Sequence, residues 1–502
     1  MTPNPTNNGV RRTLRALVVV ALFGGAAANA RAADAPPPPP AADMTDVIRL
    51  TVRPAALPVP ALKYRMLPEV ADQQPGNAAV LYLTAARQMT EARANAVAGT
   101  ANPKPVDAPR PADDSDLIDS LLDAPLESFP KHKARELVNR YAAALDQFRL
   151  ATLRDRCHFD PPFRTEGFAT LLPYVNDARP LARVAAVAAR LKAAEGDAAG
   201  AVELLGRVFT FARHLDADAF LIQVLVGAAV AQHGIRTLPD VMQMPGGPNL
   251  YWALGTVPSP MFDLAKCWEA ERAGVHFTIP FMREARAGRL SAEQWRASMA
   301  SITRAGQAAG AHNAATAEDF AMALMAAQQY PPAKRYAIDQ LKLAPADVER
   351  MSVPQVLGMY WVGQYDRFSH ETAAALTLPF PQALPRLAAQ EARLQRDGGR
   401  EWGPLSVFFP AATRAVVNGR MPDRRVAALR CVEAVRAYAA AHDGKAPESL
   451  DRLTDVPAPV DPITGRPFAY ARTADGFTIE APPVDANRGQ KTGVRIEAKW
   501  AK

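Results

Sequence analysis

Cysteine is scarce in this 502-residue chain, which has three, at positions 157, 267 and 431. No two of them form a Cys-x-x-Cys pair, so the sequence has neither a thiol redox motif nor the ligand spacing of a zinc ribbon. At most one disulfide can form, so the fold must depend on its core and not on a disulfide framework. We expect all three thiols to be buried as small apolar side chains.

A strong charge excess is also missing once the N-terminal segment 1–32 is set aside. The whole chain carries +7, but this segment contains four arginines and no acid, which leaves 54 basic side chains against 51 acidic ones. Nucleic-acid-binding domains concentrate basic residues on one surface, so this balance predicts no nucleic-acid partner. Aromatic residues are only 7% of the chain, and its hydrophobic share is rich in alanine, a strong helix former.

The segment 1–32 has the three parts of a secretory signal peptide. Arginines 11, 12 and 15 precede an apolar run over residues 16–28, and small residues at 30–32 suit cleavage before Ala33. The run is shorter than the roughly 20 residues of a spanning helix, so we expect cleavage and no stable membrane span afterwards. The predicted location is the periplasm or cell envelope, or outside the cell. The general export route is favoured, and the pair Arg11-Arg12 leaves the twin-arginine route open.

Proline dominates the stretch that follows. Residues 36–40 are five consecutive prolines, which lack N–H donors and favour the extended polyproline II form. We therefore predict that residues 33–57 are a disordered, Pro-rich tether. Residues 57–68 are again punctuated by proline, and we expect them to lie on the body of the protein as an extended arm.

Residues 58–420 are predicted to form an α-helical domain. Within it, residues 179–214 have the pattern of a helix pair with a break at Gly196-Asp197, and the spacing of Ala189, Ala201 and Leu205 is similar to one tetratricopeptide unit. The Trp, Tyr and Pro of that repeat are missing, and no clean 34-residue repeat occurs elsewhere. Residues 219–231 predict a helix buried on all sides. The expected architecture is mostly α, an irregular array of helical hairpins that is tetratricopeptide-like in part.

Two further helices are predicted before this pair. A cluster of acids at residues 113–116 is typical of a helix N-terminus, where negative charge favours the positive end of the helix dipole. A helix is also predicted over residues 131–156, because apolar residues recur there at helical spacing. The residues on its apolar face are Leu137, Tyr141, Leu145 and Phe148.

Residues 421–502 have a different pattern and predict a C-terminal α+β module. A helix over about residues 423–442 ends at Asp443-Gly444, and three short strands follow it, the last of them over residues 494–500. We expect this module to dock on the helical domain, with the apolar face of its helix packed against apolar residues just upstream. The helix face is Ala428, Cys431, Val435 and Tyr438, and the upstream residues are Phe408, Phe409 and Val416.

Two segments carry a resemblance to known families. Residues 429–450 (LRCVEAVRAYAAAHDGKAPESL), followed by residues 461–470, resemble the C-terminal part of the type II secretion major pseudopilins. The Gly-Phe-Thr-Leu processing site and long apolar helix of pseudopilins are absent, so no fibre subunit is predicted. Residues 157–260, with PNLYWAL at 248–254, resemble uncharacterised exported proteins of planctomycete bacteria. That resemblance implies no activity and no catalytic residues.

Three short fragments look like the motifs of the serine penicillin-recognising enzymes. They are Ser128-x-x-Lys131, Tyr174-x-Asn176 and Lys491-Thr-Gly493, and in such enzymes the serine is the nucleophile and the lysine activates it. Their separations along the chain fit that fold poorly, and too little sequence follows the third fragment for the strand and helix expected there. We favour the alternative that Ser128 caps the following helix, with Pro130 in its first turn.

Metal chemistry has little support in the sequence. Cys157, His158 and Asp160 could begin a metal site, but adjacent residues point apart, and no two histidines have i, i+4 spacing. We predict no metal and no cofactor.

The favoured hypothesis is a non-catalytic envelope protein with a helical scaffold or binding surface, whose partner is an unknown protein or envelope component. The alternative is a secreted or periplasmic hydrolase, with Ser128, Lys131, Tyr174 and Lys491 as its candidate residues.

Overall fold

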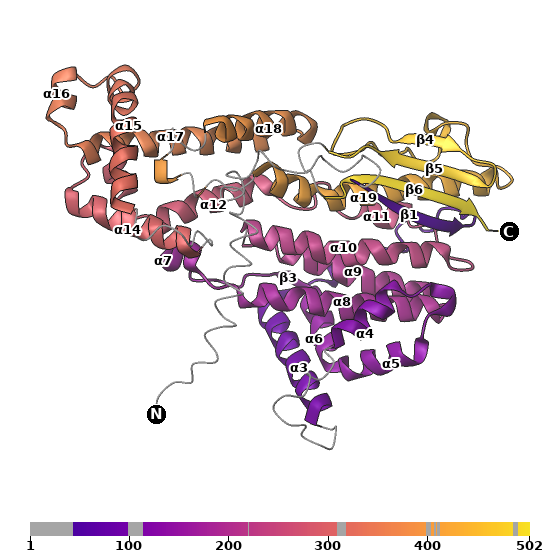
Figure 1. Cartoon of the computed structure of the whole chain (residues 1–502). Coiled ribbons are helices and arrows are strands. Elements are labelled where there is room, and N and C mark those ends of the chain that lie inside the picture. Colours follow the sequence, from indigo (N-terminus) through magenta and orange to yellow (C-terminus); the bar gives the residue numbers. More distant parts are fainter. Residues whose placement is uncertain are drawn as a thin grey trace. The chain divides into compact units, whose positions relative to one another are not determined.

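The computed structural model describes residues 44–98, 114–218, 220–308, 318–397, 403–405, 408, 412–484 and 490–501. Over these residues the protein is mostly helical, with 17 α-helices and a small mixed sheet of four strands (Figure 1). The predicted signal peptide and the start of the predicted tether lie outside this range. The described residues form two compact units: unit 1 holds residues 161–171 and 264–416, and unit 2 holds residues 44–160, 172–263 and 417–501.

Unit 2 contains the predicted helix pair. It consists of α8 (Pro173–Ala194) and α9 (Ala198–His214), so the predicted break at Gly196-Asp197 is confirmed. Gly196 adopts a φ of +86°, a conformation that side-chain-bearing residues rarely take. The carboxylate of Asp197 accepts a hydrogen bond of 2.8 Å from the Gly200 amide and so caps α9.

A third helix, α10 (Leu221–Gln243), runs beside this pair, and two contacts fix its register against α8. Gln223 donates a 2.8 Å hydrogen bond to the hydroxyl of Tyr174, and Arg190 pairs with Asp240 at 2.7 Å. Residue 223 lies 49 positions after 174, and residue 240 lies 50 positions after 190. Because both residue numbers rise together, α8 and α10 are parallel. Contacting residues of the two helices are a nearly constant 49–50 positions apart along their line of contact, which we call the seam.

Among the residues that the structure describes, α10 is the one helix long and apolar enough to cross a membrane, with a mean hydropathy of 1.2 over its most apolar window. Of that window, 67% is buried inside the protein. Gln223, a polar residue in its first turn, is fully buried and hydrogen-bonded. These features are typical of the core helix of a folded domain, as the apolar pattern of residues 219–231 predicts.

Four other helices of unit 2 precede α8: α3 (Ala78–Ala98), α4 (Asp114–Asp123), α5 (Lys131–Arg140) and α6 (Ala142–Thr152). The first turn of α4 holds two acids, which confirms the predicted N-terminus. The single helix predicted over 131–156 is wrong, because the backbone breaks at Tyr141 (φ −100°, ψ 16°) between α5 and α6. Leu137, Tyr141 and Phe148 are nevertheless buried, and Leu145 is half-buried.

The small sheet also belongs to unit 2. The three predicted strands are β4 (Ala469–Arg472), β5 (Gly476–Ala481) and β6 (Gly493–Trp500), which pair in antiparallel order. A fourth strand, β1 (Thr45–Val52), pairs in parallel with β6 and gives the order β1-β6-β5-β4. The prediction of a disordered tether over 33–57 is therefore wrong for strand β1 and for the residues that follow it, since Arg53 and Ala55 are hydrogen-bonded to Arg436. Leu50 and Val52 are buried on one side of this strand.

The last helix, α19 (Ala412–Ala441), runs through the predicted boundary between residues 420 and 421. The predicted start of the module helix near residue 423 is thus wrong, since Pro422 lies inside one continuous helix. The module helix does pack on the predicted helical domain, through Tyr251, but the expected partner residues are wrong, and Val416 is part of α19 itself. Phe408 lies in the core of unit 1, with its ring 5.9 Å from that of Phe168, whereas Tyr438 packs against the cluster around Tyr251 in unit 2. Phe409 lies outside the described residues.

Residues 53–57 and the short helix α11 (Tyr251–Gly255) complete this part of unit 2. Arg436 of α19 is buried and donates to the carbonyl oxygens of Arg53 and Gly247, at 2.9 and 3.1 Å. The Ala55 amide donates to the Arg436 carbonyl at 3.1 Å. The segment that leaves strand β1 is therefore held by hydrogen bonds from α19.

Unit 1 is built around α17 (Val353–Leu376), whose buried aromatic residues form its core. Trp361 and Phe368 are almost fully buried there, and Trp268 donates a 3.0 Å hydrogen bond to the Ser369 carbonyl. The other helices are α7 (Phe163–Glu166), α12 (Leu264–Thr278), α13 (Met282–Arg286), α14 (Ala292–Ala308), α15 (Glu318–Asp339), α16 (Pro345–Arg350) and α18 (Phe380–Asp397).

The three cysteines are divided between the units, with Cys267 in unit 1 and Cys157 and Cys431 in unit 2. All three are buried, as predicted, and none forms a disulfide.

Candidate functional site

The four candidate residues of the hydrolase alternative all lie in unit 2, but the structure does not bring them together. Ser128 and Lys131 lie at the surface beside Phe129, whose ring centroid is 5.2 Å from the guanidinium of Arg190. Tyr174 and Arg190 are 16 positions apart on α8, which is about 24 Å at roughly 1.5 Å per residue. Lys491 precedes β6, and Figure 1 shows that sheet and α5 on opposite sides of the layer formed by α8, α9 and α10.

Ser128 does not cap α5, so that prediction is wrong as well. It is the last residue of a short 3-10 turn, Leu126–Ser128, and the N-cap of α5 is Pro130, with no side-chain hydrogen bond. Ser128 thus precedes the cap position, and the first helical bond runs from the Ala134 amide to the Pro130 carbonyl. Ser128 and Lys131 therefore do not lie one turn apart on one helix, which is the arrangement that the Ser-x-x-Lys motif implies.

Tyr174 is held in a buried position at the start of α8. Its ring stacks on Phe159 with 3.9 Å between centroids and 3° between planes, and its hydroxyl accepts a hydrogen bond from Gln223. Burial raises the pKa of Tyr174 well above its ordinary value, and the nearby Asp218 carboxylate adds to that effect. The phenol thus stays protonated at neutral pH and is no candidate for a general base.

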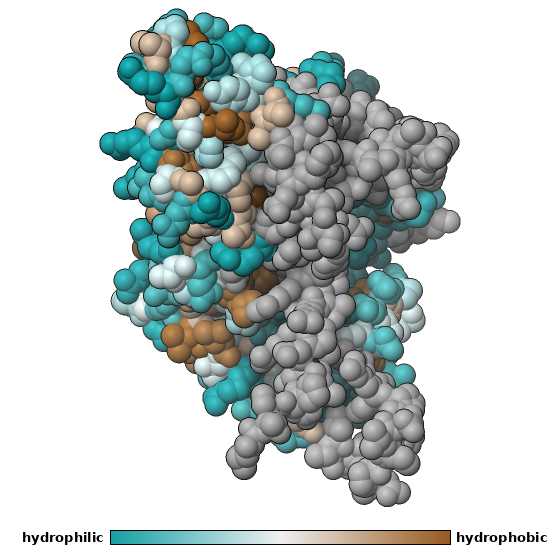
Figure 2. Space-filling view, turned by 60° about the vertical axis from the view of Figure 1, so that its left-hand side comes forward, coloured by the Kyte–Doolittle hydropathy of each residue, from teal (hydrophilic) through white to brown (hydrophobic). Residues whose placement is uncertain are grey.

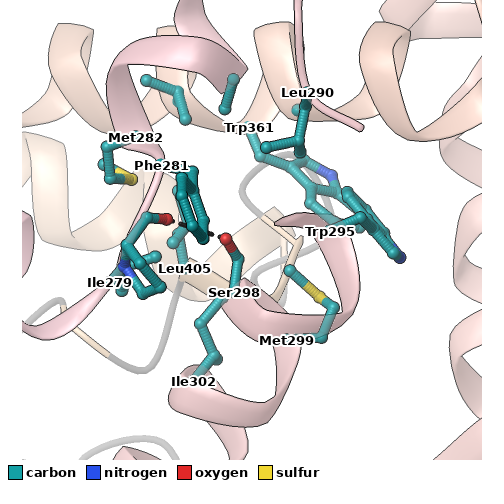
Figure 3. A pocket seen from close by; sticks show the side chains of 14 residues that line it. Ile279, Phe281, Met282, Leu290, Trp295, Ser298, Met299, Ile302, Trp361 and Leu405 are labelled. Carbon is teal, nitrogen blue, oxygen red and sulfur yellow. Dashed lines mark hydrogen bonds between the residues drawn. The ribbon is translucent and has the colours of Figure 1, made fainter. Parts of the chain in front are cut away.

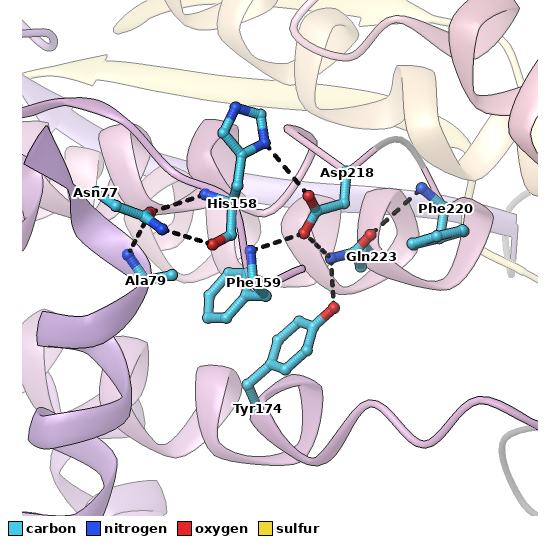
Figure 4. A network of polar contacts seen from close by, with 8 residues as sticks. All are labelled: Asn77, Ala79, His158, Phe159, Tyr174, Asp218, Phe220 and Gln223. Atoms are coloured by element: carbon cyan, nitrogen blue, oxygen red, sulfur yellow. Dashed lines mark hydrogen bonds and ion pairs between the residues drawn. The ribbon is translucent and has the colours of Figure 1, made fainter. Parts of the chain in front are cut away.

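The loop around His158 is fixed by a network of polar contacts (Figure 4). Asp218 accepts a hydrogen bond from the Phe159 amide at 3.1 Å and contacts Nδ1 of His158 at 3.3 Å. Asn77 holds the backbone of His158 on the other side, accepting from its amide at 2.9 Å and donating to its carbonyl at 2.7 Å. The network ties this loop to the N-terminus of α3 and to α10. Short parallel strands β2 (Gln74–Asn77) and β3 (Arg154–Arg156) pair beside it.

An Asp–His pair of this kind orients the imidazole in catalytic triads, but a triad also needs a nucleophile. Cys157 is buried, and burial together with Asp218 raises the pKa of its thiol well above the ordinary value. A neutral buried thiol is a poor nucleophile. The described residues also contain no group of three side chains able to hold a metal ion. The contacts of this network therefore hold the loop in place and indicate a structural role.

A more suitable site is a cavity of about 440 Å³ in unit 2, which we call the arm groove. It lies between residues 65–72, the end of α6 and one face of α9, and its volume is in the range of ligand pockets, roughly 300–1,000 Å³. The arm passes over Gly206 because that residue has no side chain. A Cβ there would lie 3.2 Å from the carbonyl oxygen of Met66. Met66 is fully buried, and its amide donates to Thr256 at 3.1 Å.

The arm groove is lined by charges of both signs. Its arginines are Arg65, Arg149 and Arg207, and its acids are Glu69, Asp72 and Glu203. Some of these charges already form pairs along the chain: Arg65 contacts Glu69 at 3.1 Å, Arg149 contacts Asp146 at 2.8 Å, and Arg207 pairs with Glu203 one helical turn away. Within the described residues Asp72 makes no ion pair. The groove can therefore accept a ligand that carries both positive and negative groups.

Catalysis by a serine, cysteine, histidine or lysine has no support in the arm groove. Its lining contains no cysteine, serine, histidine or lysine. The two threonine hydroxyls are already bonded within their helices, Thr152 to the Arg149 carbonyl at 2.8 Å and Thr210 to the Gly206 carbonyl at 2.9 Å. The arrangement suits binding by charge-assisted hydrogen bonds.

A second, smaller pocket lies in unit 1 and is apolar (Figure 3). Its volume is about 30 Å³, and the stacked rings of Trp295 and Trp361, 5.2 Å apart, form one wall. Ser298 is its main polar residue, and its hydroxyl donates to the Pro280 carbonyl at 2.8 Å. Phe281, at the edge, has a φ of +65°. The pocket has room for about two water molecules and none for a larger ligand.

The described part of the face in Figure 2 shows no large apolar patch. In Figure 2 hydrophilic residues predominate on the described part of the face, and hydrophobic residues form small separate groups. Phe277 and Phe281 of unit 1 are each only 37% exposed. Single exposed apolar side chains are normal on folded proteins, whereas binding surfaces form contiguous patches.

No family model, no curated protein and no solved structure matches this chain. The sequence alone did not lead to the arm groove. Its one local signal is the spacing of four between Arg65 and Glu69 and between Glu203 and Arg207. The crossing of the arm over α9 joins Met66 to Gly206, and no local pattern encodes a contact between segments so far apart in the sequence.

Proposed function

We propose that this protein is exported and works in the cell envelope as a non-catalytic binding protein, with the arm groove as its binding surface. The observation that supports this proposal is the lining of the groove. It combines three arginines with three acids, and its only hydroxyl side chains are bonded to helix carbonyls. A site of this kind can hold a charged ligand, and it contains no serine, cysteine, histidine or lysine to act as a nucleophile or base.

The ligand class follows from the charges. A short peptide segment of an envelope protein carries amide groups and side chains of both signs, and it would fit a cavity of about 440 Å³. Its acidic group would bind Arg207 or Arg149, and its basic group would bind Asp72. Charge-assisted hydrogen bonds of this kind are about twice as strong as neutral ones.

Other features are consistent with the proposal. The predicted signal peptide in residues 1–32 supports the envelope location, and the near balance of charge in the rest of the chain argues against a nucleic-acid partner. The succession of α8, α9 and α10, in which α8 and α10 are parallel, supports a tetratricopeptide-like hairpin array, a type of fold that offers extended binding surfaces. We further propose that the C-terminal module is pseudopilin-like, that the chain is akin to the planctomycete exported proteins, and that it uses no cofactor.

The test is a charge swap in the groove. The double variant Glu203→Arg/Arg207→Glu keeps an ion pair one turn apart on α9, so it preserves the helix while it inverts the charge pattern of the wall. We expect the wild-type protein to capture one or a few partners from the native envelope fraction, and the swapped variant to lose them. Equal capture by both proteins would show that the arm groove is not the binding surface.

A matched control is available in unit 1. Arg367 and Glu371 are also spaced by four and pair at 2.9 Å on α17, so the swap Arg367→Glu/Glu371→Arg changes the same charges away from the groove. This control should capture the same partners as the wild type.

Sequencing the mature N-terminus tests export, with loss of residues 1–32 expected. Covalent labelling by a fluorescent penicillin would contradict the non-catalytic proposal and favour the hydrolase.

A further inference from the structure

A cluster of basic residues lies along the seam of α8 and α10 in unit 2, and it shares no residue with the arm groove. The nearly constant offset between these parallel helices places His233 opposite Arg183. Arg179 precedes Arg183 by one helical turn, and Arg236 follows His233 by a little less than one turn. The register of the seam therefore brings three arginines around one imidazole.

Neighbouring elements hold the flanks of this cluster. Arg183 donates to the carboxylate of Asp119 and, at 3.3 Å, to the Ser115 carbonyl, both on α4. On the other flank, Arg425 of α19 pairs with Asp46 of β1 at 3.2 Å and donates to the amide oxygen of Gln232 at 2.6 Å.

Arg425 also adds to the positive charge near Arg236. Gln232, which accepts its hydrogen bond, lies one turn before Arg236 on the same face of α10. The Nε of Arg425 is buried and has no hydrogen-bond partner among the described residues. The fourth arginine of the cluster is thus held in place, and its Nε–H remains able to donate a hydrogen bond.

The charges of this cluster do not balance. Four arginines meet two acids, and each acid already pairs with one of them. Arg179 and Arg236 are exposed, and the described residues provide no ion pair for either. Burial, helped by the three arginines of the seam, lowers the pKa of His233 to about 4, while Asp119 opposes this effect. At neutral pH the imidazole is therefore neutral and two positive charges remain uncompensated.

We propose that Arg179, Arg236 and His233 form a binding site for a phosphate dianion, as free phosphate or as a phosphate monoester. Guanidinium groups bind phosphate oxygens in a bidentate manner, and two uncompensated arginines suit the charge of about −1.5 to −2 that such a group carries near neutral pH. A single carboxylate would balance only one of them. The ligand supplies the negative charge that the two helices lack at this place, and the ring N–H of His233 can donate to it as well.

The test is a calorimetric titration of the full mature protein with inorganic phosphate at pH 7. We expect saturable binding that becomes at least tenfold weaker in Arg179→Gln/Arg236→Gln. The matched control is Arg472→Gln on β4, an exposed arginine for which no ion pair is described, and this variant should bind as the wild type does. The absence of saturable binding, or equal binding by the double variant, would overturn the proposal.

A second readout separates a specific site from weak general attraction. Bound phosphate should raise the pKa of His233 from about 4 toward its ordinary value, because a nearby negative charge stabilises the imidazolium. The NMR signal of the His233 ring reports this shift directly, and a pKa that does not move would contradict the proposed contact.

Vesicles with and without phosphatidic acid then distinguish the sources of the phosphate. Binding to phosphatidic acid that needs Arg179 and Arg236 assigns the site to a lipid monoester. Binding of free phosphate alone assigns it to a soluble ligand.

Discussion

The two units of this protein differ in what they bury. Unit 1 has a core of aromatic and aliphatic side chains around Trp361 and Phe368, and its buried polar residues are uncharged within the described part of the chain. Unit 2 also buries charged residues. Within the described part of the chain, every buried charged residue belongs to this unit. They are Arg190, Asp240, Asp423, Arg424, Glu433, Arg436 and Asp461.

This difference reflects how each unit is assembled along the sequence. Apolar contacts have little directional preference, so a core such as that of unit 1 is fixed by shape and volume. The buried charges of unit 2 bond specific partners far away in sequence. Arg424 joins α19 to the Thr492 carbonyl and to Asp461, and Arg436 joins it to residues near 53 and 247. Such bonds select one arrangement of distant segments, because any other would leave a charge buried without a partner.

The comparison predicts that removing one buried charge damages unit 2 severely. Asp461 and Arg424 are 1% and 0% exposed and pair at 2.8 Å. Asp461→Ala should lower the free energy of unfolding of unit 2 by about 3–5 kcal/mol, because it leaves the Arg424 guanidinium buried without its carboxylate. Hydrogen exchange followed by mass spectrometry can measure this separately in peptides of α10 and α17. Full protection of α10 in the variant would contradict the prediction.

Much of unit 2 could be predicted from local sequence patterns, but its assembly could not. The helix pair and the strands β4, β5 and β6 follow from periodicity and from turn residues such as Gly196 and Asp443-Gly444. Strand β1 was missed although Ile48, Leu50 and Val52 alternate with polar residues, because the neighbouring prolines suggested a tether. Its parallel pairing with β6 joins segments near opposite ends of the chain, and no local pattern encodes such a contact.

The candidate sites were harder to predict for the same reason. The basic cluster depends on the register of α8 against α10, and the buried pair of Arg190 and Asp240 that sets this register is not visible in either helix alone. Conversely, short motifs suggested a site where none is assembled. Ser128 and Lys131 match Ser-x-x-Lys in sequence, but the break before α5 removes the shared helix that would give the motif its chemistry.

A buried carboxylate also makes unit 2 sensitive to pH. Burial raises the pKa of Asp423 from 3.8 to about 6, and Arg420, 3.6 Å away, offsets this only in part. The folded state therefore binds this proton more tightly than the unfolded state. The contribution of Asp423 to stability is full below about pH 4 and is lost as the pH rises through 6.

The substitution Asp423→Asn should remove this dependence. The amide that replaces the carboxylate keeps an oxygen for the Met261 amide, which now bonds Asp423 at 2.8 Å, and it is neutral at every pH. At pH 7 we expect unit 2 of the variant to be more stable than the wild type by about 1–3 kcal/mol, since each pKa unit is worth about 1.4 kcal/mol. At pH 4 the two proteins should be nearly equal. Urea unfolding at both pH values measures the difference, and a variant less stable at pH 7 would contradict the argument.

The contact between Tyr438 of α19 and the rest of unit 2 should contribute less to stability than the buried charges do. Tyr438 is half-buried and packs against the cluster that contains Tyr251 and Leu453. Tyr438→Asp should cost about 1–2 kcal/mol, because it places a charge against apolar side chains. Tyr438→Phe keeps the ring and should change little. Thermal unfolding with limited proteolysis checks this, and early cleavage of the C-terminal module in both variants would show that the ring is not what matters.

The smallest loss of stability is expected when an exposed charge of unit 1 is removed. Glu371 contacts Arg367 at 2.9 Å and Arg393 at 3.5 Å, and all three side chains are at least partly exposed. Water solvates these groups almost as well as they solvate one another, so Glu371→Ala should lower the free energy of unfolding by no more than about 0.5 kcal/mol. The measurement is the exchange protection of α17, with Asp461→Ala as the reference. Because both substitutions remove one carboxylate from an arginine, a loss as large as that expected for Asp461→Ala would mean that burial does not explain the difference between the two units.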